Sequence, residues 1–80
     1  MRTISYNGNK VELTLVKTKG KPYVHYTNTY EFRVSLEGNC LIVEVKEKGK
    51  YKPFDKLLID KYIEKSTVYS NVLNMLTENL

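Results

Sequence analysis

The chain contains no alanine, glutamine or tryptophan, and it has only one cysteine and two prolines. A lone cysteine supplies neither a disulfide framework nor a metal cluster, which is typical of the reducing cytoplasm. No run approaches about 18 apolar residues, and the first ten residues contain no apolar signal-peptide core. We therefore expect a cytoplasmic protein without a transmembrane helix, and its 80 residues fit a single domain spanning 1–80.

Lysine, asparagine and tyrosine are abundant instead, with 11, 7 and 7 copies respectively. These residue types use A/T-rich codons, whereas alanine uses G/C-rich ones. Small alanine-free chains of this composition are common products of viruses and mobile elements. Such an origin predicts a small effector of a host protein that acts in the host-cell cytoplasm.

The basic charge is concentrated in one segment. The formal net charge is +4, and residues 46–56 alone carry five lysines against two acids, which is +3. The phrase Lys-x-Lys-Gly-Lys occurs at residues 17–21 and again at 46–50. Two basic loops of this kind can contact one phosphate backbone, but lysines beside a glycine are also the ordinary composition of a solvated turn.

The first 48 residues alternate between apolar and polar side chains, which indicates β-strands with one buried face. Asn7-Gly8 is a strong two-residue hairpin signal, and Lys19-Gly20 and Gly38-Asn39 mark two further turns. With these turns as loops, apolar residues pair on a single face. The expected pairs are Ile4–Val11, Leu13–Tyr26, Leu15–Val24, Phe32–Val45, Val34–Val43 and Leu36–Leu41.

The stretch from residue 22 to residue 36 keeps one parity throughout, so it is either one long strand or two strands. In the second alternative, Thr27-Asn28-Thr29 forms the loop and Tyr26 pairs with Tyr30. The choice matters because one long strand brings the two lysine loops to the same end of the sheet, whereas two strands separate them.

The C-terminal third is expected to cover the apolar face of the sheet. Residues 49–53 read as a basic connector, and residues 54–80 as one or two helices, with a break near Lys65–Ser66 favoured. The sequence thus predicts an α+β fold. An antiparallel meander of four to five strands over 1–48, open or curled towards a small open barrel, packs against these C-terminal helices.

Catalysis and metal binding are not expected. His25 and Cys40 fall on different strands, and no catalytic or metal-ligand motif is present, so we predict neither an enzyme nor a cofactor. We predict a small binding protein that acts through protein–protein contacts, because tyrosine and exposed apolar side chains are typical of interfaces. A homodimer is favoured over a monomer. The predicted partner-binding residues are Val16, Tyr23, His25, Ile42 and Tyr69.

The alternative is a nucleic-acid-binding module. Lysines neutralise phosphates, and tyrosines stack on unpaired bases. Both occur around the repeated phrase and on the predicted outer face of the sheet. The residues of this alternative site are Lys17, Lys19, Lys21, Tyr23, Lys46, Lys48, Lys50, Tyr51 and Lys52.

Overall fold

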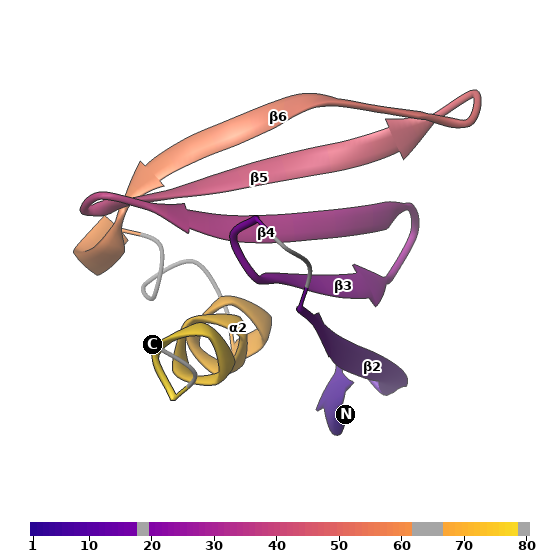
Figure 1. Ribbon diagram of the computed structural model, residues 1–80. Coiled ribbons are helices and arrows are strands. Elements are labelled where there is room, and N and C mark those ends of the chain that lie inside the picture. Colours follow the sequence, from indigo (N-terminus) through magenta and orange to yellow (C-terminus); the bar gives the residue numbers. More distant parts are fainter. Residues whose placement is uncertain (18–19, 62–66, 79–80) are drawn as a thin grey trace.

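Six antiparallel strands and a C-terminal helix make up the computed structural model, which describes residues 1–17, 20–61 and 67–78 (Figure 1). The strands pair in sequence order, β1-β2-β3-β4-β5-β6, and form one open sheet. Their bounds are β1 Arg2–Tyr6, β2 Asn9–Val16, β3 Tyr23–Thr27, β4 Glu31–Glu37, β5 Cys40–Glu47 and β6 Lys50–Leu58. Residues 59–61 are helical, and α2 spans Thr67–Thr77.

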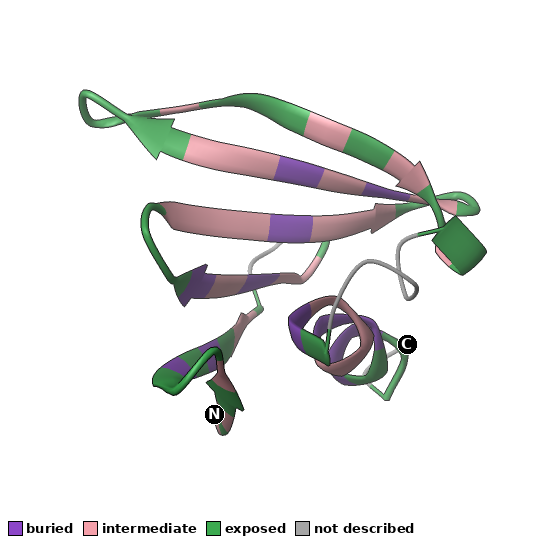
Figure 2. Cartoon of the chain, turned by 180° about the vertical axis from the view of Figure 1, so that it is seen from behind, coloured by how far each residue is buried: buried purple, intermediate pink, exposed green. Residues whose placement is uncertain are grey.

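The core forms because apolar and polar residues alternate along the strands. Odd and even positions point to opposite faces, and α2 lies against one face only (Figure 1). We call this the helix side and the other the open side. Figure 2 shows the buried positions recurring along the strands and on α2. The core consists of Val11, Leu13, Val24, Tyr26, Val34, Leu41, Val43, Val68, Val72, Leu73, Met75 and Leu76.

The predicted hairpin registers are largely confirmed. Ile4 is opposite Val11, Leu13 is opposite Tyr26, and Val34 is opposite Val43. Asn7 and Gly8 both have positive φ, at 51° and 79°, as the type I′ turn requires. The Lys19-Gly20 loop lies partly outside the described residues, but the Leu15–Val24 pair that it predicted is present.

Residues 22–36 form two strands, so the one-strand alternative is wrong. The predicted loop is also displaced, because residues 28–30 form the turn and Tyr26 is opposite Phe32 rather than Tyr30. This shift of two residues leaves every side chain on its expected face, since the side-chain period of a strand is two.

The prediction of four to five strands is wrong because β6 was assigned to the connector 49–53 and to a helix from residue 54. Lys48 and Gly49 have φ of 53° and 79°, the same pattern as Asn7-Gly8, and they turn the chain back along β5. Phe54 and Leu58 are four residues apart, a spacing that fits one face of a helix as well as one face of a strand. The β-bulge at Phe54 and the proline before it interrupt the strand pattern that would have favoured the second reading. The sheet is open rather than closed into a barrel.

The helical cover is confirmed for α2, which buries Val68, Val72, Leu73, Met75 and Leu76. The expected break at Lys65–Ser66 lies outside the described residues. The backbone of α2 lies close to β1, β2, β3 and β4, and within the described ranges it does not approach β5 or β6. The β5–β6 hairpin therefore extends past the helix (Figure 1).

Candidate functional site

The two lysine loops lie at opposite ends of the sheet. Lys17 and Lys21 flank the connection from β2 to β3, whereas Lys48 and Lys50 belong to the turn between β5 and β6. Three antiparallel strands, β3, β4 and β5, separate the two loops along the chain. Since an odd number of strands leads from one end of the sheet to the other, the second loop lies at the opposite end (Figure 1). A single phosphate clamp made from both loops is therefore excluded by the topology. Lys19 lies outside the described residues.

Arg33 occupies the middle of the open side. Its guanidinium carbon lies 4.1 Å from the ring centroid of Tyr51 and 5.9 Å from that of Tyr23. Arg33 Nε donates to Glu44 Oε1 at 2.8 Å, and this hydrogen bond raises the pKa of Arg33 above its ordinary value. Both tyrosines that were predicted to stack on bases thus already pack against a protein cation.

The remaining charges of the open side are also balanced. Glu31 lies 3.6 Å from His25 Nε2 and 3.5 Å from Lys46 Nζ. The strand register places four cations and four anions on this side, a formal sum of zero with histidine neutral. They are Lys10, Arg33, Lys46 and Lys56 against Glu12, Glu31, Glu37 and Glu44.

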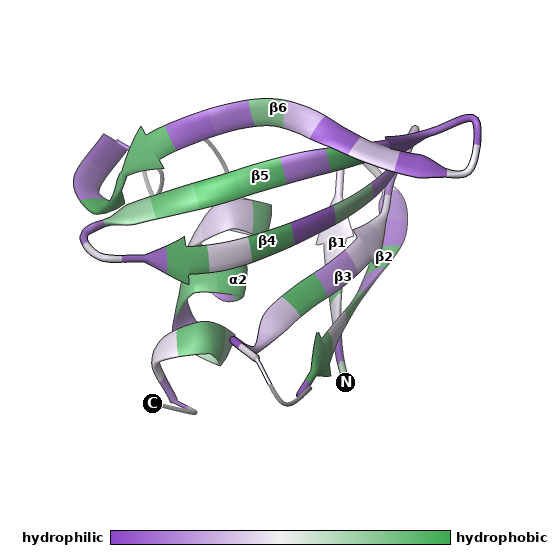
Figure 3. Ribbon diagram, turned by 45° about the horizontal axis from the view of Figure 1, so that its top comes forward, coloured by the Kyte–Doolittle hydropathy of each residue, from purple (hydrophilic) through white to green (hydrophobic). Residues whose placement is uncertain are grey.

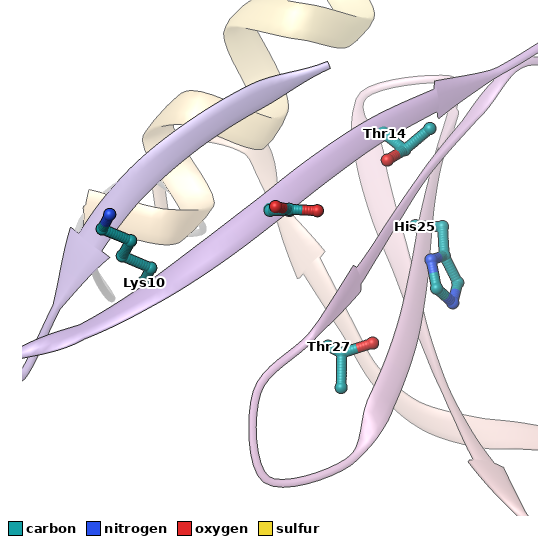
Figure 4. Close-up of a pocket in the computed structure, with 5 residues that line it drawn as sticks. Lys10, Thr14, His25 and Thr27 are labelled. Atoms are coloured by element: carbon teal, nitrogen blue, oxygen red, sulfur yellow. The ribbon is translucent and has the colours of Figure 1, made fainter.

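A shallow hollow of about 550 Å³ opens on this side between β2 and β3. Figure 4 shows Lys10, Thr14, His25 and Thr27 around it, and Glu12 completes the lining. Its lining is polar and of mixed charge. Within residues 1–17, 20–61 and 67–78, no group of three or more His, Cys, Asp or Glu side chains is arranged to hold a metal ion.

The predicted partner-binding residues divide between the two sides. Val16, Tyr23, His25 and Ile42 share the open side, where Val16 is opposite Tyr23. Tyr69 lies on α2, packs against the core and is hydrogen-bonded to Tyr26. The expectation that Val16, Ile42 and Tyr69 are exposed is wrong, because all three are half-buried.

The most exposed aromatic side chains in the described part of the chain instead gather on the helix side, near the first turn of α2. Tyr30 is 59% exposed and Phe54 is 57% exposed. Phe54 is the extra residue of the β6 bulge, since Val43 is opposite Asp55 and Glu44 is opposite Pro53. Bulges re-aim side chains, and here the bulge directs Phe54 towards Phe32.

Phe54 joins a chain of packed rings. Its centroid lies 5.5 Å from that of Phe32 in an edge-on arrangement, and Phe32 stacks on Tyr26 at 5.2 Å. Two adjoining hollows of about 430 and 150 Å³ share Phe54 as a wall, and we call them together the aromatic groove. The aromatic residues that line it are Tyr6, Tyr26, Tyr30, Phe32, Phe54 and Tyr69.

The aromatic groove opens beside the β5–β6 turn. Val45, Lys46 and Glu47 line its larger hollow, and Lys52 is opposite Val45. We call the exposed charged residues of this turn the lysine tip, and Figure 3 shows its hydrophilic colouring next to the apolar sheet. The lysine tip consists of Lys46, Glu47, Lys48, Lys50 and Lys52, with a formal charge of +3.

Lys48 and Lys50 are the free charges of the lysine tip. Lys46 contacts Glu31, and Lys52 lies 3.8 Å from Glu47, but neither of the other two lysines has an acidic partner within the described part of the chain. Lys48 also has a φ of 53°, a conformation that lysine adopts rarely and asparagine more readily. Asn7 occupies the equivalent position of the first hairpin.

Sequence reasoning identified the lysine tip but missed the aromatic groove. Phe54 was assigned to a helix, and Tyr30 was counted among the apolar residues of the inner face. A usable signal was present, since Lys48-Gly49 resembles Asn7-Gly8 as a turn and therefore predicts another strand after it. Phe54 meets Val68 and Tyr69 of the first turn of α2 in the aromatic groove, and no local pattern encodes this long-range arrangement.

No helix in the described ranges is both long and apolar enough to cross a membrane. Comparisons with protein-family models, with curated proteins and with solved structures find no match to this chain.

Proposed function

We propose that the protein is a non-catalytic binding module that captures an acidic segment of a partner protein. An apolar side chain of that segment occupies the aromatic groove, and its carboxylates contact the lysine tip. The observation that carries this proposal is the juxtaposition of two strongly exposed aromatic side chains with a turn of charge +3. Exposed aromatic anchors beside a complementary charge are the features by which protein interfaces recognise partners.

The backbone of the lysine tip supports this proposal. Lys48 holds a left-handed conformation that asparagine or glycine adopts with less strain. A lysine at this position lowers the free energy of unfolding and adds an unpaired charge beside the aromatic groove. Strained residues of this kind concentrate at binding sites.

A single-stranded nucleic acid is the alternative partner, because lysines with exposed aromatics are also typical of such binders. The open side gives this alternative little support, since its formal charge is zero and Arg33 covers both tyrosines. The free thiol of Cys40 is consistent with the cytoplasmic location that we propose for the protein.

A titration followed by amide NMR tests the proposal with three probes. The first is the peptide acetyl-Glu-Asp-Phe-Asp-Glu-amide, the second is its counterpart with four lysines, and the third is an oligothymidylate or oligouridylate. We expect the acidic peptide to shift the amides of Tyr30, Val45 and Phe54, and to bind more weakly as salt is raised. The lysine peptide should not bind.

Variants locate the binding site. Phe54→Ser should weaken binding of the acidic peptide by about tenfold, because truncating a central anchor removes most of its contacts. Lys48→Gln with Lys50→Gln should weaken it and reduce its salt dependence. Leu58→Ser is the matched control, since Leu58 is a 49% exposed side chain of the same strand away from the aromatic groove. Equal binding of both peptides, or binding of the oligonucleotides alone, would contradict the proposal.

A further inference from the structure

Within residues 1–17, 20–61 and 67–78, the open sheet has two free edges, β1 and β6, and they differ in composition. Free edges can pair with strands of other molecules, and proteins suppress this with lysine, proline and bulges. Edge strand β6 has all three, namely Lys50, Lys52 and Lys56, Pro53, and the bulge at Phe54. Edge strand β1, with the sequence Arg-Thr-Ile-Ser-Tyr, has none of them.

The hydrogen-bond pattern shows which groups each edge presents. The two residues that flank a two-residue turn exchange both backbone hydrogen bonds. The pairs that follow are alternately non-hydrogen-bonded and hydrogen-bonded, and a residue in a non-hydrogen-bonded pair directs its N–H and C=O groups away from its partner strand. In the β5–β6 hairpin the closing pair is Glu47–Lys50, so the backbone nitrogen of Pro53 faces the free edge. Because proline has no N–H, the free edge of β6 has one hydrogen-bond donor fewer.

The β1–β2 hairpin shows the same alternation of hydrogen-bonded and non-hydrogen-bonded pairs. Its closing pair is Tyr6–Asn9, so Ile4 is bonded to β2, whereas Thr3 and Ser5 direct their N–H and C=O groups to the free edge. Both residues are exposed and both carry hydroxyl groups. Edge strand β1 therefore offers two donors and two acceptors that nothing in its own composition protects.

This edge is complementary to itself. If two copies of β1 align antiparallel about Ile4, Thr3 of each lies opposite Ser5 of the other, and the free backbone groups of both copies face one another. The isoleucines then meet in the close, non-hydrogen-bonded type of pair. Arg2 is opposite Tyr6, and its charge is already paired with Glu78 at 3.4 Å. The two arginines lie at opposite ends of the pairing and do not repel.

We propose that β1 pairs with β1 of a second copy of this chain, centred on Ile4, so that two six-stranded sheets become one continuous sheet. The pairing is isologous, as most homodimer interfaces are. It contains four backbone hydrogen bonds and one isoleucine contact. Such a short interface gives a weak dimer that forms as the protein concentration rises.

Sedimentation equilibrium between about 10 µM and about 1 mM, a range that covers weak association, tests the proposal. The wild-type mass should rise from one chain towards two. Ser5→Pro should abolish the rise, since it removes an edge-facing N–H but no bond to β2, while circular dichroism shows the fold retained. Ser5→Val keeps this N–H and should still dimerise. A wild-type monomer at the highest concentration, or a Ser5→Pro dimer, overturns the proposal.

Cross-linking tests the register. In a Cys40→Ser background, Ile4→Cys should form a disulfide-linked dimer under mild oxidation, because the two side chains are directly opposite one another. Thr3→Cys should cross-link at least about tenfold more slowly, since its partner position is Ser5 and not Thr3. Equal rates for the two variants would overturn the proposed register. Neither test involves the aromatic groove anchors Tyr30 and Phe54, so its result is independent of the proposed function.

Discussion

Tyr26 shows how a single residue links the sheet to the helix. It is 3% exposed, it stacks on Phe32, and it is hydrogen-bonded to Tyr69 of α2. Burial is the main cause that raises the pKa of its hydroxyl above the ordinary value of 10.0, and the interactions with Tyr69 add to the effect. The hydroxyl therefore stays neutral in the folded protein under conditions in which it ionises in the unfolded chain.

This difference predicts a loss of stability in alkali. Because the pKa of Tyr26 is higher in the folded state than in the unfolded state, its contribution is complete below pH 10 and declines as the pH rises further. Urea unfolding at pH 8, 10 and 11 should show a steeper decline in the free energy of unfolding for wild type than for Tyr26→Phe. Tyr30→Phe alters an exposed ring and should behave as wild type. Parallel declines for wild type and Tyr26→Phe would show that this hydroxyl does not set the pH dependence.

At the scale of single elements, the β5–β6 hairpin combines the strained turn, the bulge and the lysine tip. Lys48 has a left-handed φ of 53°, and Asn7, at the equivalent position of the first hairpin, has a φ of 51°. Lys48→Asn should raise the free energy of unfolding by about 0.5–1 kcal/mol, since asparagine tolerates this conformation better. Chemical denaturation measures the gain, and the NMR titration should show weaker binding of the acidic peptide.

Two variants control for this result. Lys50→Asn removes an equal charge at an extended strand position, so it should give no gain in stability. Asn7→Lys places lysine in the equivalent left-handed position and should lower the free energy of unfolding by a similar amount. If Lys48→Asn is no more stable than wild type, the turn does not store the strain that we infer.

The elements also show what the sequence can and cannot predict. Asn7-Gly8 and the strict parity of the apolar residues determine the first hairpins, because a slip of one residue would expose the whole core face. The position of β6 was not predictable in this way, since Pro53 and the bulge at Phe54 interrupt its alternation. The same bulge concealed the aromatic groove, whose existence depends on the bulge and on the reach of α2 together.

At the scale of the whole molecule, α2 covers only part of the sheet. Its backbone lies close to β1–β4, whereas β6 is a free edge that the described helix does not approach. Regions with less burial open locally at a lower free energy than the core. The amides of β6 that bond to β5 should therefore exchange with solvent on the order of tenfold faster, or more, than those between β3 and β4.

Hydrogen–deuterium exchange followed by NMR measures this difference directly. Addition of the acidic peptide should slow exchange at the β5–β6 hairpin and leave β3 and β4 unchanged, since the aromatic groove lies on the hairpin side. Uniform protection across all six strands would mean that the molecule opens only as a unit.

The sequential order of the strands also has a consequence for synthesis on the ribosome. Each strand pairs with the one made just before it, so the hydrogen-bonded sheet can assemble while the chain is still emerging. Its apolar side has no cover during that time, because α2 follows all six strands. The contacts to β1 run from Asn71 of α2, and from Glu78 just after it, to Arg2. We therefore expect the nascent chain to pass through a stage in which an apolar sheet surface and the edge of β1 are exposed together, and we expect its tendency to aggregate to be greatest at this stage.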